Sequence, residues 1–120
     1  MSEATEQIRL FNWAANWEDE IPELRLLFHP PNGGWRAVST GKRLKAQGTK
    51  PGVPDVWLPV ARGGYHGLVI EMKFGRNKPT DTQIWWIDEL MEQGWRVEVC
   101  YSCEEAKGVI LDYLTGTVHD

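Results

Sequence analysis

Two short runs rich in apolar residues stand on either side of the dipeptide Gly63-Gly64 in this 120-residue chain. The first run covers Val53 to Val60 and the second covers Gly67 to Phe74. Because glycine readily adopts the positive φ angles of tight hairpin turns, this arrangement predicts two antiparallel strands joined by the turn. A chain of this length builds one hydrophobic core, so we expect a single domain over residues 1–120.

The rest of the chain predicts helices and two further strands around this hairpin. Helices are expected at Ser2–Trp17, at Ser39–Gln47, from Thr80 to Gly94 and from Ser102 to Gly116, the last two opened by capping-box patterns. Strands are expected at Leu24–Phe28 and Arg96–Tyr101. The order α-β-(α)-β-β-α-β-α predicts an α/β fold with a mixed sheet.

The predicted hairpin carries the polar residues that indicate chemistry. Asp55 follows Pro54 in the first strand, and Glu71 and Lys73 lie in the second. Side chains alternate faces along a strand, so Glu71 and Lys73 share a face about 6–7 Å apart. Two carboxylates on neighbouring strands can hold Mg²⁺ or Mn²⁺ and leave positions for a phosphate oxygen and water. The alternative is a surface ion pair between Glu71 and Lys73, with Asp55 in a turn.

Charge is distributed unevenly along the chain, although its net value is −4. Residues 36–78 contain 9 basic side chains and only 2 acidic ones, Asp55 and Glu71. The flanking thirds are acidic. This basic block suits a polyanionic backbone, whereas solvation of a loop is the alternative for each residue alone. The basic side chains expected around the two acids are Arg36, Lys42, Arg43, Lys45, Lys50, Arg62, Arg76 and Lys78.

Composition excludes two broad classes of protein. With 42% hydrophobic and 25% charged residues, the chain has no signature of disorder. It has no apolar run long enough to span a bilayer, and its N-terminus lacks the pattern of a signal peptide. We therefore expect no membrane partner and a cytoplasmic location.

Several segments taken together resemble the VRR-Nuc domain of the PD-(D/E)XK nuclease superfamily. They are Leu27–Gly33, Gly41–Gly48, Pro51–Asp55, Glu71-Met72-Lys73 and Gln83. The resemblance covers residues 6–113 and implies a restriction-endonuclease-like core. Stand-alone domains of this kind are typical of phage and bacterial genomes, so a phage-encoded chain would act in the host cytoplasm.

The resemblance also implies an activity and a set of site residues. The implied activity is metal-dependent endonuclease cleavage of DNA, with one or two Mg²⁺ or Mn²⁺ ions held by Asp55, Glu71 and the main-chain carbonyl of Met72. Glu6 in the first helix would complete the acidic cluster, and Glu3 is a less favoured substitute. Gln83 would steady Lys73 or the attacking water. Lys73 is expected to be cationic and to orient the nucleophile.

Some of these residues also have structural interpretations. A carboxylate such as Glu6 is favoured in the first turn of any helix by the helix dipole. Gln83 is the third residue of a predicted capping box, so capping and catalysis stay open for it. His29 and Asn32 are further candidates, and His29 before two prolines is more typical of a hydrogen-bonded structural histidine. One departure from the family is that Gly33-Gly34 follows Asn32.

Two other classes of function remain as alternatives. A nucleic-acid-binding module that does not cut would use the same basic residues, but it has no reason to place two carboxylates among them. A thiol-redox protein is suggested by Cys100 and Cys103, a Cys-x-x-Cys motif at a strand-to-helix junction. Only seventeen residues follow Cys103, which leaves no strand to pack over such a motif.

The preferred DNA structure does not follow from the residues. One 120-residue domain offers one active site. Cutting both strands of a duplex or a branched junction requires two sites, so we expect a homodimer with two-fold symmetry and a preference for branched or junction DNA, as in junction-resolving relatives.

Overall fold

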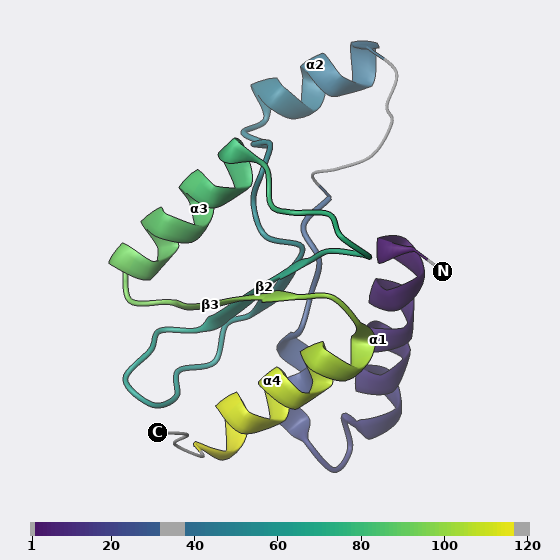
Figure 1. Cartoon of the computed structure of the whole chain (residues 1–120), viewed down its shortest axis with the longest axis vertical. Helices are drawn as coiled ribbons and strands as arrows, with labels where there is room; N and C mark the ends of the chain where they lie inside the picture. Colours follow the sequence, from purple (N-terminus) through teal and green to yellow (C-terminus); the bar gives the residue numbers. More distant parts are fainter. Residues whose placement is uncertain (1, 32–37, 117–120) are drawn as a thin grey trace.

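The computed structural model describes residues 2–31 and 38–116, and it shows a three-stranded sheet with helices on both sides (Figure 1). The strand order is β1-β2-β3, with β2 in the centre. In chain order the elements are α1 (Glu3–Trp17), the 3-10 helix η1 (Pro22–Leu26), α2 (Val38–Ala46), β1 (Val56–Leu58), β2 (Leu68–Met72), α3 (Asp81–Glu92), β3 (Arg96–Cys100) and α4 (Cys103–Thr115). The predicted α/β class with a mixed sheet is confirmed. In the described ranges, every helix is too short or too polar to cross a bilayer.

Strands β1 and β2 form the predicted antiparallel hairpin. The turn contains Gly63 and Gly64, whose φ angles of +56° and +87° lie in the left-handed region that favours glycine. Strand β1 is shorter than the alternation predicted. Pro54 and Pro59 stand just outside it, and a proline has no N–H to donate to a strand ladder.

Helix α3 connects the central strand to β3, so that β3 pairs with β2 in parallel. The predicted capping box at the start of α3 is confirmed. The Thr80 hydroxyl accepts a hydrogen bond from the Gln83 N–H at 3.3 Å, and the Gln83 side-chain oxygen accepts one from the Thr80 N–H at 2.8 Å. Gly94, with φ +89°, follows the end of the helix as predicted.

The side chains of β2 alternate between two covered faces of the sheet. Leu68, Ile70 and Met72 are no more than 1% exposed and belong to the hydrophobic core formed with α1 and α4. Val69 and Glu71 point to the other face, where α3 packs against β3 and Gln83 reaches Glu71. Burial on both faces keeps the whole of β2 away from water.

The strand predicted at Leu24–Phe28 is wrong. Residues Pro22–Leu26 form the 3-10 helix η1 instead, with Pro22 at the position where its fixed φ starts a helical turn. Only Phe28 pairs with a strand residue, through an isolated bridge to Trp57. The prolines that follow His29 cannot donate ladder hydrogen bonds, so the pairing ends there.

The remaining helices follow the predictions with one correction. Ser2 and Ser102 cap α1 and α4 through their side-chain oxygens, and the basic helix predicted after residue 38 is α2. The second capping box is incomplete, because the Glu105 carboxylate accepts the N–H of Tyr101 rather than that of Ser102.

Candidate active site

Asp55 and Glu71 lie opposite each other across the hairpin. The ladder ends where Val56 pairs with Ile70, and Asp55 lies one position beyond it on the side of Glu71, where its Oδ2 atom accepts the Met72 N–H. Directly opposed side chains of antiparallel strands have Cβ atoms about 4.5–5.5 Å apart. The negative charge of the Asp55 carboxylate acts on Glu71 and raises the pKa of Glu71. We call these two residues the acidic pair, and their like charges favour the binding of a proton or a cation between them.

Glu71 is a buried carboxyl group with an unused oxygen. It is 1% exposed, and its Oε2 atom is buried without a hydrogen-bond partner. Its Oε1 atom accepts a hydrogen bond from Gln83 at 2.7 Å and lies 3.8 Å from the Lys73 ammonium. Burial, followed by the charge of Asp55, raises the pKa of Glu71 to about 8, although Lys73 opposes this shift. Lys73 is only 7% exposed, so the alternative of a surface ion pair is wrong.

Gln83 has the capping role that its sequence position left open, and it also contacts the buried carboxyl group of Glu71. Its side-chain oxygen faces the Thr80 N–H, which can only donate, and this fixes the orientation of the amide. The Nε2 group therefore points to the acidic pair and donates to Glu71. Gln83 was expected to contact Lys73, but its side chain bonds to Glu71 instead. The Gln83 amide thus connects the first turn of α3 to the buried carboxyl group of Glu71.

The backbone of Met72 faces the acidic pair. Its N–H donates to Asp55 Oδ2 at 2.8 Å, whereas the N–H of Lys73 points the other way, to the Cys100 carbonyl at 2.9 Å. In an extended strand the N–H and C=O of one residue point to the same side. The Met72 carbonyl therefore lies on the side of Asp55, as a ligand to a shared cation would.

The oxygen atoms at this point are of the kind that a hard divalent cation takes as ligands. Such a cation takes carboxylate and carbonyl oxygens, and the buried Oε2 of Glu71 has no other partner. Among the described side chains, no three His, Cys, Asp or Glu residues converge on one point. A cation here would therefore rely on the acidic pair, the Met72 carbonyl and water.

Comparison with known proteins agrees with this arrangement. The model of the VRR-NUC domain family matches residues 1–104. The chain belongs to the VRR-NUC domain family. A solved structure described as a VRR_NUC domain protein superposes with a TM-score of 0.81 at 27% identity, covering 100% of this chain and 93% of the other. No protein of curated function matches the chain.

The VRR-NUC domain is a nuclease-type domain, so the chain has a nuclease role and a nucleic-acid substrate. The superposition with the solved VRR-NUC structure also supports the predicted nuclease-like fold. Within this fold the acidic pair, Lys73 and Gln83 form one cluster on the face of the sheet that α3 covers, in which Glu71 and Lys73 are buried and Asp55 and Gln83 are partly exposed.

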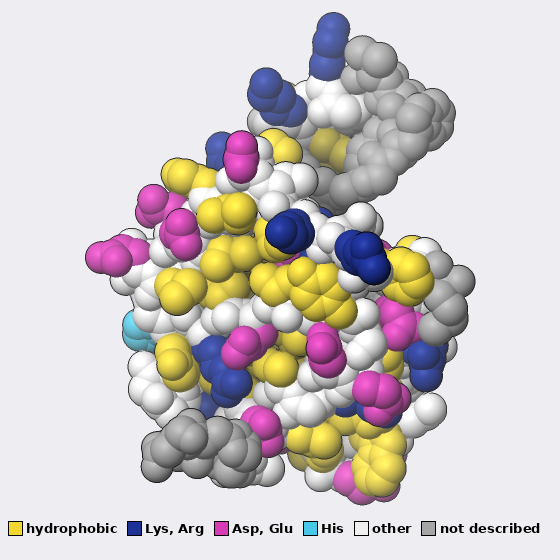
Figure 2. Space-filling model, viewed as in Figure 1, with side chains coloured by type: hydrophobic (Ala, Val, Ile, Leu, Met, Phe, Trp, Pro, Cys, Tyr) yellow, Lys and Arg dark blue, Asp and Glu magenta, His cyan; other side chains and the backbone are white. Residues whose placement is uncertain are grey.

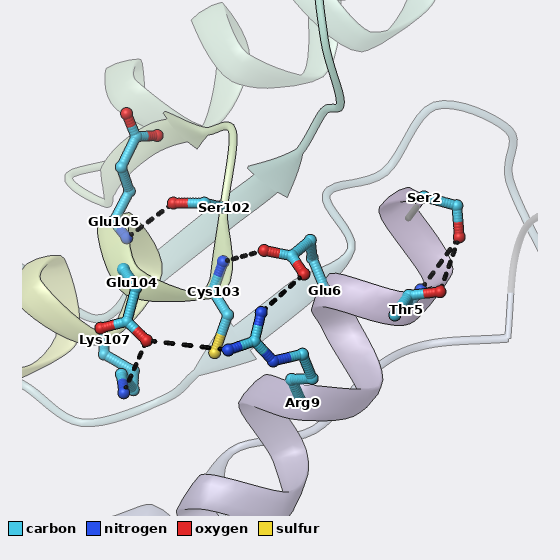
Figure 3. Close-up of polar contacts among 9 residues, drawn as sticks. All are labelled: Ser2, Thr5, Glu6, Arg9, Ser102, Cys103, Glu104, Glu105 and Lys107. Atoms are coloured by element: carbon cyan, nitrogen blue, oxygen red, sulfur yellow. Dashed lines mark hydrogen bonds and ion pairs between the residues drawn. The ribbon is translucent and has the colours of Figure 1, made fainter.

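Glu6 does not join the acidic pair of this VRR-NUC domain. Its carboxylate accepts a hydrogen bond from the Cys103 N–H at 3.1 Å and forms an ion pair with Arg9 at 3.1 Å (Figure 3). These contacts hold the first turn of α4 and lower the pKa of Glu6, chiefly through the bond from Cys103. Glu3, one turn earlier, is the α1 carboxylate whose charge reaches Glu71. The contacts thus give Glu6 a structural role, and a part for the substitute, Glu3, in the acidic cluster stays a prediction.

His29 is the hydrogen-bonded structural histidine that its position suggested. Its Nδ1 atom lies 2.6 Å from the main-chain oxygen of Asp55. A carbonyl oxygen only accepts, so Nδ1 carries the proton. His29 therefore positions the backbone of the residue that supplies half of the acidic pair.

The basic residues expected to contact nucleic acid are exposed where the structure describes them. They are Lys42, Arg43, Lys45, Lys50, Arg76 and Lys78, whereas Arg36 and Asn32 lie outside the described residues. Figure 2 shows Lys and Arg side chains over α2 at one end of the molecule, with acidic side chains over α3 and the α4 half. Arg62 is a correction, because it forms an ion pair with Glu23 at 2.6 Å instead of facing the site.

The two cysteines have the environment of buried core residues. Cys100 and Cys103 are both free thiols and are each 2% exposed. Burial raises the pKa of Cys100 to about 12 and also raises the pKa of Cys103. A redox-active thiol needs a lowered pKa and access to a partner, so this environment argues against the thiol-redox alternative.

Proposed function

We propose that this VRR-NUC domain is a metal-dependent endonuclease that hydrolyses phosphodiester bonds of DNA, with Mg²⁺ or Mn²⁺ held at the acidic pair. The observation that carries the proposal is the buried oxygen of Glu71 that has no hydrogen-bond partner, directly across the hairpin from Asp55. An unsatisfied buried carboxyl oxygen is costly, and a cation that binds it removes that cost.

The residues that would hold the cation are Asp55, Glu71 and the main-chain carbonyl of Met72, for one ion or for two. A bound divalent cation would supply positive charge at the scissile phosphate and activate water for attack. The raised pKa of Glu71, about 8, means that cation binding at neutral pH releases a proton.

The neighbouring side chains orient and balance this charge. Lys73 lies 3.8 Å from Glu71 and offsets negative charge that develops on the phosphate in the transition state. Gln83 holds Glu71 Oε1 by its 2.7 Å bond and so leaves Oε2 for the cation. His29 and the Met72 N–H hold the backbone and the carboxylate of Asp55, which limits the motion of the acidic pair.

The exposed basic side chains supply the DNA contacts in this proposal. Helix α2 has no acidic residue in its sequence and contributes Lys42, Arg43 and Lys45. Lys and Arg contacts to phosphates release counterions, so DNA affinity falls steeply with salt. These contacts are sequence-independent, which fits cleavage directed by DNA shape.

We further propose that the substrate is branched or junction DNA and that the active unit is a homodimer. Each domain offers one acidic pair, so cutting two strands requires two copies. Helix α3 carries exposed apolar side chains that such contact would cover, Ile84 at 44%, Trp85 at 55% and Met91 at 57% exposure. Light scattering of the protein in solution measures whether two copies associate.

The cleavage proposal is tested with labelled single-stranded, duplex, flap and four-way-junction DNAs in Mg²⁺, Mn²⁺ or EDTA. We expect nicks with either metal, no cleavage in EDTA and the highest rate on a branched DNA. Asp55→Ala should lose Mg²⁺ binding measured by calorimetry and should not cleave. Cleavage that persists in EDTA or in the Asp55→Ala protein would show that the acidic pair is not needed for hydrolysis. Equal cleavage rates on all the DNAs would show that the enzyme does not prefer branched DNA.

The same assay separates the nuclease from a module that only binds. A module of that kind would retain DNA affinity in every condition and would nick no substrate with either metal. The acidic pair disfavours a module that only binds DNA, because two carboxylates repel phosphate unless a cation lies between them.

Changing Glu3 and Glu6 should have opposite kinds of effect. Glu6→Ala should lower the Tm by several degrees, because the buried N–H of Cys103 loses its acceptor, and it should leave cleavage by the folded protein nearly unchanged. Glu3→Gln should leave the Tm nearly unchanged and raise the Mg²⁺ concentration needed for half-maximal cleavage, because it removes negative charge near Glu71. Thermal melts and Mg²⁺ titrations distinguish the two. If Glu6→Ala impaired cleavage without lowering the Tm, and Glu3→Gln lowered the Tm without affecting cleavage, Glu6 would be the α1 residue of the acidic cluster.

A further inference from the structure

A cavity of about 390 Å³ is lined mainly by apolar and aromatic side chains, and two of its lining residues, Phe28 and Pro30, flank His29, which contacts the main-chain oxygen of Asp55. Phe28, Trp57 and Trp86 provide its aromatic walls, and Lys50 is its one charged residue among the described lining. We call this cavity the aromatic pocket. Its volume is in the range of small-molecule sites, which begins at about 300 Å³, and therefore exceeds what a water molecule or a single methyl group needs.

Two elements place the aromatic pocket next to the acidic pair. Asp55 immediately precedes β1 and Trp57 lies within it, two residues further on, which is the spacing at which strand side chains return to one face. On α3, Gln83 and Trp86 are three residues apart and are neighbours on the helix surface. Asp55 belongs to the acidic pair and Gln83 donates to it, whereas Trp57 and Trp86, the next residues on the same sides, line the aromatic pocket.

The aromatic rings are held by contacts that leave ring surface available. Phe28 stacks on Trp57 with ring centroids 6.3 Å apart and an interplanar angle of 27°. The indole N–H groups of Trp57 and Trp86 donate to the carbonyls of Pro54 and Pro51, at 2.9 and 3.0 Å. Phe28 nevertheless remains 46% exposed. The exposed surface of Phe28 is therefore the part of the pocket on which a flat ligand with a π surface can stack.

We propose that the aromatic pocket receives one unpaired nucleobase of the DNA substrate, from a nucleotide adjacent to the phosphate at the acidic pair. The proposal rests on the proposed function, because a nuclease that binds phosphate beside this pocket brings a base within reach of it. Aromatic stacking is tolerant of base identity, and Lys50 at the pocket contacts the neighbouring phosphate. A base inside a duplex cannot enter, so the pocket selects DNA with an unpaired nucleotide near the cleaved bond.

The test is a scan of abasic positions in DNA binding, measured by fluorescence anisotropy in Mg²⁺ with DNA whose phosphorothioate linkages resist hydrolysis, so that the cation is present and the result does not depend on cleavage. In a labelled single strand or flap, one abasic position should weaken binding by about 5- to 100-fold, the worth of one stacked base. Phe28→Ala should weaken binding of the intact strand by a similar factor and should remove the effect of that abasic position. Its affinity for fully paired duplex should stay at the wild-type value.

Trp17→Ala is the matched control, because Trp17 is 48% exposed, close to the 46% of Phe28, and lies outside the aromatic pocket. It should keep the abasic effect at full size. If Phe28→Ala does not fold, the abasic scan with the wild-type protein still decides. Three results would overturn the proposal. They are a wild-type protein with no sensitive abasic position, a Phe28→Ala protein with the same abasic effect as wild type, and a Phe28→Ala protein that binds duplex as weakly, relative to wild type, as it binds the single strand. Absence of cleavage with a normal abasic effect would count against the proposed function alone.

Discussion

Replacing Glu71 by glutamine is expected to abolish cleavage and, in the same protein, to stabilise the metal-free fold at alkaline pH. Glutamine has the size of glutamate and keeps an oxygen that can accept the hydrogen bond from Gln83, but it carries no charge. Both effects have one cause. Burial and the charge of Asp55 raise the pKa of Glu71 to about 8, so the charge that holds a cation destabilises the fold when no cation is bound.

The sign of the pH dependence follows from the direction of this shift. The folded-state pKa of Glu71, about 8, lies above its ordinary value of 4.5, so the folded protein binds more protons than the unfolded chain between these values. The contribution of Glu71 to the free energy of unfolding therefore falls as the pH rises through this range. The Glu71→Gln protein lacks the titration, so its stability relative to wild type should increase with pH and be highest above pH 8.

Thermal melts in EDTA at acid, neutral and alkaline pH measure this difference, and the DNA panel measures cleavage. Adding Mg²⁺ should raise the Tm of the wild type by mass action and leave that of Glu71→Gln unchanged. Glu98→Gln on β3 is the matched control, because Glu98 is a partly exposed strand carboxylate that pairs with Arg96 at 3.4 Å. Its pH trend and its cleavage should follow the wild type. Retained cleavage, or parallel pH trends in wild type and Glu71→Gln, would show that Glu71 is not the buried cation ligand.

The hairpin and its polar residues could be predicted from the sequence because their signals are local. A Gly63-Gly64 turn between alternating runs leaves little choice of structure, and Thr80 with Gln83 defines a helix start. The register could not be predicted, since a slip of one residue moves every side chain to the other face. The facing of Asp55 and Glu71 is therefore a property of the folded hairpin.

The roles of Glu3 and Glu6 show where sequence information ends. The two residues are three positions apart on α1, so either can face the sheet after a modest rotation of the helix. The rotation is set by a contact between Glu6 and Cys103, which are 97 residues apart in the chain. The strand predicted at Leu24–Phe28 failed for a related reason, because a short apolar run fits a strand or a buried helical turn equally well.

The aromatic pocket was also missed by sequence reasoning, although a signal for it was present. The tryptophans read as core residues, as most tryptophans are. The spacing of Trp57 from Asp55 and of Trp86 from Gln83 places each on the side of its element that a site residue already occupies. Applied to both elements together, that rule predicts an aromatic surface beside the acidic pair.

Replacing Lys73 by methionine is expected to lower kcat by about 100- to 1,000-fold, the usual cost of losing one group that stabilises transition-state charge. The Lys73 ammonium is 3.8 Å from Glu71 and its side chain is 9% exposed, so its charge acts in a water-poor site where it is weakly screened. Methionine fills nearly the same volume without charge, which limits the loss of packing. Because Lys73 lowers the pKa of Glu71, its removal should also shift the activity profile to higher pH.

The comparison that isolates this role is Lys78→Met, which removes an exposed ammonium from the loop between β2 and α3. Lys78→Met should raise the Kd for DNA and reduce its salt dependence by about one phosphate contact, with kcat near the wild-type value. Lys73→Met should show the opposite division, a large loss in kcat and a change in Kd of only a few fold, and Lys73→Arg should recover part of kcat. If Lys73→Met weakened DNA binding as Lys78→Met does and kept kcat, Lys73 would be one more phosphate contact. The charge at the acidic pair would then have to be balanced by the cation, since the Gln83 amide that donates to Glu71 is uncharged.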